Sequence, residues 1–327
     1  MDTYPISGRS LEKHYYIDGD QFGQQYKEHL SDFYTWHQAG HAEHWVLFSH
    51  NIGEYLSIDE TALSNGELYT IITNKKAKGK KGALVAMVNG TCSDKVIEVL
   101  NKIPLSKRRK VKEVTLDMAG SMNKIVRASF PKATKVIDRF HVQKLAYDAL
   151  QEIRIKHRWE AIDAESEAIR EACYNQAQYE PTVLANGDTV KQLLARSRYL
   201  LFKSPDNWTI KQKDRAKILF AQYPDIEKAY SLTHSLRMIF THNTDKNVAL
   251  TKLAQWYNKV EESGFKSFNS IMNTMRDNYR EILNYFDNRS TNASAESFNA
   301  KLKAFRATLR GVKDIKFFLY RVAKIWA

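Results

Sequence analysis

The sequence predicts an α/β protein whose mixed β-sheet is completed by a helix near the C-terminus, after a long helical insertion. Ten of the thirteen glycines lie in the first 120 residues, where short apolar runs alternate with turns. Frequent glycine is typical of strands and tight turns. After His141, apolar residues recur at three- and four-residue steps, which is the period of a helix. The 327 residues are enough for one large domain or two modest ones.

Three short strands are predicted first, joined by short connections. Residues 55–59 alternate between apolar and polar, and residues 67–73 are rich in strand-forming residues after a turn at residues 64–66. Residues 82–88 form an apolar run that begins at a glycine. Because the connections are short, we expect an antiparallel meander.

Helices and strands then alternate. Residues 93–102 predict a short helix with its apolar residues on one face, and residues 111–117 predict a strand. A second helix around residues 122–126 and a strand at residues 134–138 complete the pattern. The order is therefore three strands, helix, strand, helix, strand. This is the order of an RNase-H-like α/β fold, a mixed sheet flanked by helices on both faces.

The rest of the chain is predicted to be helical, with an insertion of about 140 residues in front of a final amphipathic helix. We therefore divide the chain into four parts. They are an N-terminal helical segment (1–50), the first part of the RNase-H-like domain (51–150), an all-helical insertion (151–287) and a C-terminal helix that completes the domain (288–327).

The charge balance favours a polyanionic partner. The formal net charge is +13, and the stretch from Arg289 to the end carries nine Lys and Arg residues against Glu296 and Asp314. A surplus of Lys and Arg on this scale is most often found in proteins that bind nucleic acid. No stretch approaches the roughly 18–20 uncharged apolar residues of a membrane span. We therefore expect a cytoplasmic, nucleoid-associated protein with DNA and no membrane as its partner.

A second basic cluster lies between the second and third predicted strands. We expect its five lysines to contact a DNA backbone: Lys75, Lys76, Lys78, Lys80 and Lys81. A solvated hairpin loop is the alternative. Residues 107–110 are also basic, and their place in front of a predicted strand indicates a loop.

Two aspartates end predicted strands. Asp59 ends the first strand and Asp117 the fourth, and in a mixed sheet these two strands can be neighbours. Clustered carboxylates are the ligands that Mg²⁺ and Mn²⁺ prefer, and two such ions catalyse phosphoryl transfer. An aspartate at a strand end is common, so the pair alone leaves a structural role open.

The last amphipathic helix supplies a third acid. Four apolar residues form one stripe along it, and a second stripe holds Glu296, Asn299, Lys303, Arg306 and Arg310. If the apolar stripe packs on the sheet, Glu296 can meet the two aspartates. The residues that follow it would then flank a bound phosphate backbone. The alternative is a surface glutamate on a basic helix.

Five motifs occur along the chain in a defined order. They are Ser-Ile-Asp-Glu at 57–60, Val-Thr-Leu-Asp-Met at 114–118, Phe-Pro-Lys-Ala at 130–133, Val-Ile-Asp-Arg-Phe-His at 136–141, and the stretch 292–303. Together they resemble the DDE transposases of bacterial insertion sequences, and most of all the group called ISL-three. The resemblance runs from about Trp45 to the C-terminus.

The resemblance implies a function and a site. Asp59, Asp117 and Glu296 would be the catalytic triad and would hold two Mg²⁺ or Mn²⁺ ions. The reaction would be cleavage at transposon ends, followed by attack of the freed 3′-hydroxyl on target DNA. His141 and Asp138, in the motif Asp-x-x-His, would support the active site or touch DNA, and we count Arg139 and His141 among the DNA-contacting residues. Without the family, His141 is more readily a core histidine at a helix start.

Members of this group usually begin with a cysteine zinc finger and a helix-turn-helix, and residues 1–44 contain no cysteine. We expect a separate polypeptide to recognise the transposon ends, or the element to be truncated. In the DNA complex we expect a homodimer or a larger assembly. Two alternatives stay open: an RNase-H-like structure-specific nuclease, and a non-catalytic DNA-binding protein derived from a transposase.

Overall fold

The computed structural model describes residues 1–63 and 66–327, which form two compact units. The sheet unit comprises Met1–Asp138 and Asn288–Ala327, and the helical unit comprises Arg139–Asp287. Two residues of the predicted turn at 64–66 lie outside the described residues.

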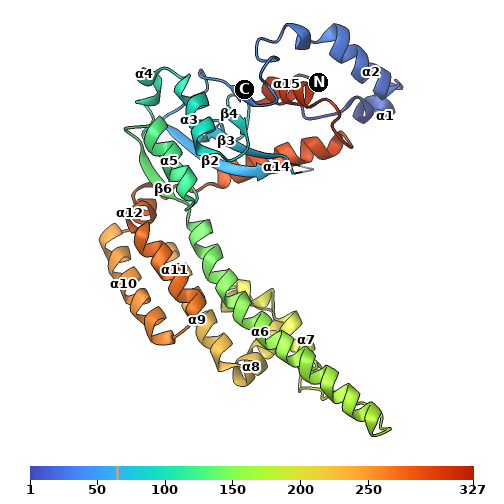
Figure 1. Cartoon of the computed structure of the whole chain (residues 1–327), viewed down its shortest axis with the longest axis vertical. Helices are drawn as coiled ribbons and strands as arrows, with labels where there is room; N and C mark the ends of the chain where they lie inside the picture. The colour runs from blue at the N-terminus through green and yellow to red at the C-terminus, as the bar shows by residue number, and fades with distance from the viewer. Residues whose placement is uncertain (64–65) are drawn as a thin grey trace. The chain divides into compact units, whose positions relative to one another are not determined.

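The sheet unit contains a six-stranded mixed sheet (Figure 1). Its strands are β1 (Trp45–Leu47), β2 (Tyr55–Ala62), β3 (Leu68–Asn74), β4 (Leu84–Asn89), β5 (Glu113–Leu116) and β6 (Thr134–Ile137). They lie in the order β1-β4-β3-β2-β5-β6. Strands β2 to β4 form the predicted antiparallel meander, and β2, β5 and β6 are parallel. Strand β1 was not predicted, because three consecutive apolar residues show no period.

Helices cover both faces of this sheet, as Figure 1 shows. On one face α3 (Ser93–Asn101) and α5 (Gly120–Ser129) pack over a core that includes Leu56 and Ile58 of β2. A short helix, α4 (Leu105–Arg108), leads into β5. On the other face α14 (Ala293–Thr308) and α15 (Ile315–Trp326) pack over a second core. The apolar stripe of α14 lies in that second core. The predicted RNase-H-like α/β class is thus confirmed.

The N-terminal segment packs within the sheet unit. It contains α1 (Glu12–Tyr15), α2 (Gly19–Gln25) and short helical turns at Gly8–Leu11, Tyr26–Leu30 and Phe33–Thr35. The Phe33 ring lies 5.1 Å from Phe317 and 5.4 Å from Tyr320 of α15, between ring centroids. Buried Arg321 donates to the carbonyl oxygen of Met1 at 2.7 Å. Aromatic contacts and this arginine therefore join the beginning of the chain to its last helix.

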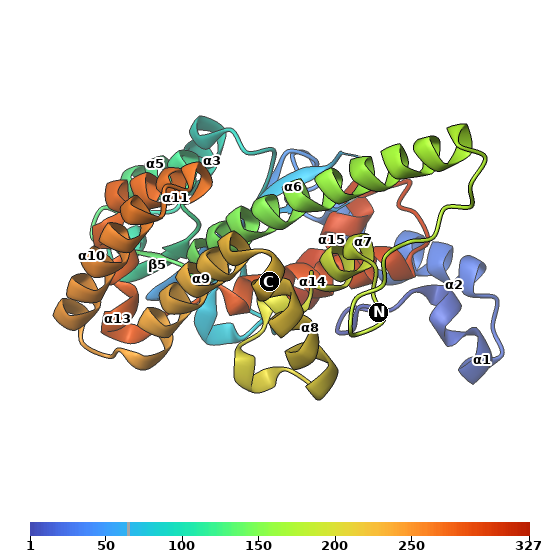
Figure 2. The same cartoon turned by 90° about the horizontal axis from the view of Figure 1, so that it is seen from below.

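The helical unit begins with α6 (Arg139–Tyr174), which packs along α9 (Figure 2). Its other helices are α7 (Val190–Arg196), α8 (Ile210–Gln222), α9 (Pro224–His242), α10 (Lys246–Ser263), α11 (Lys266–Asp277), α12 (Tyr279–Leu283) and α13 (Tyr285–Asn288), with single turns at Leu200–Phe202 and Pro205–Asn207. The unit begins twelve residues before the expected boundary at 151, because α6 is one continuous helix without glycine or proline. Within the described residues, no helix has the length and apolar character of a membrane span.

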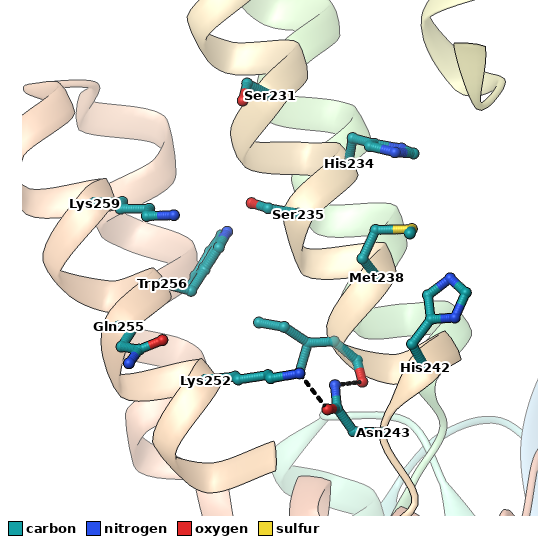
Figure 3. A pocket seen from close by; sticks show the side chains of 11 residues that line it. Ser231, His234, Ser235, Met238, His242, Asn243, Lys252, Gln255, Trp256 and Lys259 are labelled. Atoms are coloured by element: carbon teal, nitrogen blue, oxygen red, sulfur yellow. Dashed lines mark hydrogen bonds between the residues drawn. The ribbon is translucent and has the colours of Figure 1, made fainter. Parts of the chain in front are cut away.

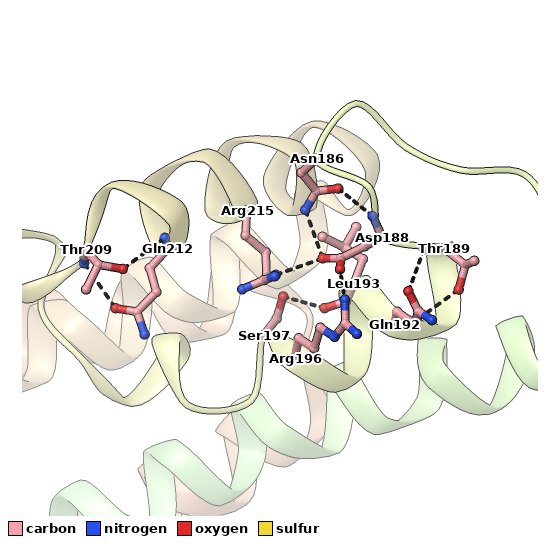
Figure 4. A network of polar contacts seen from close by, with 10 residues as sticks. All are labelled: Asn186, Asp188, Thr189, Gln192, Leu193, Arg196, Ser197, Thr209, Gln212 and Arg215. Carbon is pink, nitrogen blue, oxygen red and sulfur yellow. Dashed lines mark hydrogen bonds and ion pairs between the residues drawn. The ribbon is translucent and has the colours of Figure 1, made fainter.

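A buried carboxylate joins α7 to α8 (Figure 4). Asp188 is 1% exposed, and it accepts hydrogen bonds from Arg215 Nε at 2.8 Å and from Arg196. Asn186 Nδ2 donates to the same carboxylate at 2.8 Å. Burial acts to raise the pKa of the Asp188 carboxyl, but the hydrogen bonds from Arg215 and Arg196 outweigh it and hold the pKa below its ordinary value.

Candidate active site

Three aspartates lie at one edge of the sheet, on neighbouring parallel strands. Continuing the register of β2 and β5 by two residues places Asp59 beside Asp117. Continuing the register of β5 and β6 by one residue places Asp138 beside Asp117. Residues two apart on a strand share a face, and neighbouring strands lie about 4.8 Å apart. The three carboxylates therefore form a row at the end of the sheet where the parallel ladders of β2, β5 and β6 stop. We call this row the acidic edge.

Asp59 was expected to end its strand, but it does not. Strand β2 continues to Ala62, because its pairing with β3 extends beyond the point where the ladder with β5 stops. Asn299 of α14 donates from Nδ2 to Asp59 Oδ2 at 2.8 Å, and the Glu60 N–H donates to Oδ1 at 2.9 Å. A residue of the C-terminal helix thus fixes the orientation of this carboxylate.

The other two aspartates are held by backbone groups. Asp117 Oδ1 accepts from the N–H of Ala119 at 2.8 Å. Asp138 is fully buried, and its Oδ2 accepts from the N–H of Asn292 at 3.1 Å. Asn292 is the N-cap residue of α14, and its Nδ2 donates to the carbonyl oxygen of Ile58 at 3.4 Å. The start of α14 is therefore bonded to both β2 and the residue after β6.

Glu296 lies in the first turn of α14, where the helix dipole favours a negative charge. Its side chain is exposed, and a carboxylate oxygen lies within 4.8 Å of an Asp138 oxygen. The predicted helix therefore does bring its acid to the acidic edge. The more specific expectation, that Glu296 meets Asp59 and Asp117, stays a prediction.

Glu60 adds another acid near this row. Burial raises the pKa of the Glu60 carboxyl, and the negative charges of Asp117 and Asp59 raise it further. Such crowding of like charges is relieved by a bound cation. The sequence pattern gave no reason to single out Glu60, because strand alternation places it on the opposite face from Asp59.

The residues predicted to contact DNA differ in exposure. Six are exposed in the sheet unit: Lys76, Lys78, Lys80, Lys81, Lys303 and Arg310. Arg139 and His141 are half-buried in the first turn of α6, where the Arg139 guanidinium lies 5.7 Å from the centre of the Tyr285 ring. Asn299 is buried against Asp59, as described above.

Two of the predicted basic residues have partners inside the sheet unit. Lys75 Nζ donates to Thr115 Oγ1 at 2.8 Å and lies 3.6 Å from Glu113 Oε1. Burial lowers the pKa of Lys75, and the charge of Glu113 partly offsets that effect. Arg306 is 7% exposed and pairs with Glu67 at 2.8 Å. These contacts assign both side chains a structural role in the free protein.

A separate hollow of about 620 Å³ lies between α9 and α10 of the helical unit (Figure 3). Its lining includes His234, His242, Lys252 and Lys259 and no acid. Lys252 Nζ donates to Asn243 Oδ1 at 2.6 Å. None of the residues predicted as site residues lines this hollow.

Fold and site together define an RNase-H-like protein with a row of carboxylates at the ends of its parallel strands. The profile of the ISL3 group of DDE transposases, described as "Transposase", matches residues 56–322. The chain belongs to this family, as the motifs predicted. It is 21% identical over 273 residues to a protein described as "Transposase for insertion sequence element IS1001", from Bordetella parapertussis. The match covers 82% of this chain and 60% of that relative. No solved structure matches the chain significantly.

Proposed function

We propose that the chain is the catalytic region of a DNA transposase, which cleaves DNA at transposon ends and joins the freed ends to target DNA. The observation that carries the proposal is the acidic edge itself. It combines a carboxylate of β2 and the carboxylates directly after β5 and β6 with a helix that is more than 150 residues further along the chain. Membership in a transposase family supports the same function.

We further propose that Asp59, Asp117 and Glu296 hold two Mg²⁺ or Mn²⁺ ions. Carboxylate oxygens are the hard ligands that these ions prefer. The crowded charges around Glu60 and the buried Oδ1 of Asn299, which has no hydrogen-bond partner among residues 1–63 and 66–327, suit a cation at this edge. When bound, the ions would activate the attacking oxygen and neutralise charge on the leaving one.

The chain's own residues would prepare the site for these ions. Asn299 and the Ala119 N–H hold two of the proposed ligands, Asp59 and Asp117, in fixed orientations, and the Asn292 N–H holds the neighbouring Asp138. Bonds of this kind to ligating side chains raise the affinity for a metal, because the ligands need not be ordered on binding. The fixed carboxylates thus lower the cost of assembling the site.

The exposed side of α14 would position the DNA. Asn299 and Arg306 of one stripe contact Asp59 of β2 and Glu67 in front of β3. Lys303 belongs to the same stripe, and Arg310 follows the end of α14 by two residues; both are exposed. We propose that they bind phosphates of the strand being cut, next to the carboxylates.

The test is cleavage of duplex DNA that carries the sequences flanking the gene, in the presence of Mg²⁺ or Mn²⁺. We expect the unaltered chain to cut one strand and to join the new 3′ end to a second duplex. The variants Asp59→Asn, Asp117→Asn and Glu296→Gln should each lose at least about 10³-fold in rate, since the metals supply several kcal/mol. Asp94→Asn, at an exposed acid of α3, is the matched control.

Retention of full cleavage by any of the three active-site variants would refute the assignment of that residue. Cleavage without any joined product would favour a structure-specific nuclease over a transposase. A separate end-recognition polypeptide, a homodimer or larger assembly on DNA, and association with the nucleoid stay predictions.

A further inference from the structure

Eight basic residues gather at the sheet edge opposite the acidic edge. We call this surface the basic edge and define it by Lys76, Lys78, Lys80, Lys81, Lys107, Arg109, Lys110 and Lys112. Seven of them are exposed, and Lys107 is half-buried. Three connections build the surface: residues 48–54 before β2, residues 75–83 between β3 and β4, and residues 102–112 before β5. Glu54 is the one acid in these three connections.

The directions of β2, β3 and β5 bring these connections to the same end of the sheet. Tyr55 at the start of β2 pairs with Glu113 at the start of β5. Leu56 pairs with Asn74, the last residue of β3. Asp59 lies four residues further along β2 than Tyr55, which is about 13 Å at the usual rise of a strand. The basic edge and the acidic edge are therefore at opposite ends of the same strands.

Hydrogen bonds tie the connection before β2 to the end of β3 and to the connection before β5. Asn74 Nδ2 donates to the carbonyl oxygen of Asn51 at 2.9 Å, and Lys107 Nζ donates to that of Ser49 at 3.3 Å. Gly53 lies so close to Asn74 that a Cβ there would fall 2.7 Å from Asn74 Oδ1. The backbone that carries the positive side chains is thus held in place by hydrogen bonds and close packing.

The basic edge is also hollowed. A cavity of about 500 Å³ is lined by His50, Lys107, Arg109, Lys110 and Lys112. A neighbouring cavity of about 780 Å³ is lined by Lys75, Lys76 and Asn288, and the two cavities share residues 52–54. A concave surface lined by cations can receive a phosphate backbone from more than one side.

The charges of this surface are largely uncompensated. In the part of the chain that the structure describes, Lys112 alone among the eight forms an ion pair, with Glu54 at 2.9 Å. The sheet unit as a whole carries 28 Lys and Arg residues against 18 Asp and Glu residues, so ten of the thirteen net positive charges lie in it. Clustered like charges repel one another, and contact with phosphates relieves the repulsion.

We propose that the basic edge binds a second duplex DNA segment, distinct from the segment that is cut at the acidic edge. The inference rests on the proposed function, because joining one DNA to another requires that two segments be held at once. Seven of the eight residues are lysines, which bind phosphates as point charges, and contacts to phosphates carry no sequence information directly. Binding here is therefore independent of sequence and sensitive to salt.

The first test measures binding of the full chain to a labelled duplex of arbitrary sequence, by fluorescence anisotropy over a range of salt concentrations without divalent metal. One variant replaces four lysines of the basic edge: Lys76→Gln, Lys78→Gln, Lys80→Gln and Lys81→Gln. The control variant removes the same charge elsewhere in the sheet unit: Lys13→Gln, Lys95→Gln, Lys124→Gln and Lys316→Gln. We expect the basic-edge variant alone to lose at least about tenfold in affinity and its salt slope to fall by up to about 3.6, which is about 0.9 for each of the four charges removed.

A second variant in another connection guards against a local folding defect: Lys107→Gln, Arg109→Gln and Lys110→Gln. It should show the same kind of loss, because both variants remove charges from one surface. Equal losses in the basic-edge and control variants would overturn the proposal. So would tighter binding of the unaltered chain to single-stranded RNA, or to vesicles containing anionic lipid, than to duplex DNA.

A second test separates this inference from the proposed function. With saturating short duplex ends and Mn²⁺, the basic-edge variant should cut at the unaltered rate but join the ends to a second duplex at least about tenfold more slowly. Joining at the unaltered rate would overturn the inference. If the unaltered chain does not cut DNA, the proposed function fails, and the anisotropy experiment still decides whether the basic edge binds duplex DNA.

Discussion

Replacing Arg306 tests whether this residue holds the fold or contacts DNA. Arg306 and Glu67 form an ion pair at 2.8 Å, with side chains 8% and 19% exposed. The guanidinium also lies 5.2 Å from the centre of the Phe318 ring. Removing one partner of a buried pair costs about 3–5 kcal/mol, because the other charge is left without compensation. Glu67 keeps some contact with solvent, so we expect a loss near the lower end, about 3 kcal/mol.

The assay is urea unfolding of Arg306→Ala, with hydrogen exchange of α14 and β3 peptides as the local measure of stability. The control is Arg310→Ala, at an exposed arginine two residues beyond the end of α14, which should change stability by less than about 0.5 kcal/mol. We expect Arg310→Ala to weaken DNA binding instead. If Arg306→Ala is as stable as the unaltered chain but loses affinity for DNA, the structural role of Arg306 is wrong.

Two further predictions concern single polar contacts. Asn299→Ala should weaken Mn²⁺ binding about 10–100-fold, because Asp59 loses the donor that orients it; unchanged Mn²⁺ affinity in a folded variant would exclude this positioning role. Asp188 has a lowered pKa in the folded protein, so its contribution to stability is present above the ordinary carboxyl pKa of about 3.9 and is lost as the pH falls through the folded value. Asp188→Asn should therefore destabilise the helical unit at neutral pH and make its stability depend less on pH in the acid range, as measured by hydrogen exchange. An unchanged pH profile would count against the ion network with Arg196 and Arg215.

The order of strands and helices could be predicted because each element has its own period. The meander, the two crossover helices and the long helical region all follow from apolar residues that recur every second or every third to fourth position. The start of the helical unit at Arg139 was harder to predict, since α6 contains no residue that marks a boundary. Strand β1 is too short to have a pattern of its own.

The site was predicted less completely, because register and partners do not follow from local periodicity. The alignment of Asp138 with Asp117 depends on how β5 and β6 pair. Helical spacing places Arg306 on the same stripe as Lys303, but it cannot show that Glu67, 239 residues away, pairs with Arg306. The basic turn after Asn74 was predicted to contact DNA. Only the antiparallel pairing of β2 and β3 shows that this turn lies at the end of the sheet away from Asp59.

The most direct measurement of the central claim is Mn²⁺ binding, followed by electron paramagnetic resonance of the free ion. Asp117→Asn removes one carboxylate charge from the middle of the acidic edge without changing the size of the side chain. The acidic edge as described predicts saturable binding to the unaltered chain, a loss of at least about tenfold in Asp117→Asn, and no change in the control Asp94→Asn. Equal Mn²⁺ affinity in all three proteins would contradict the claim that these carboxylates hold the metal.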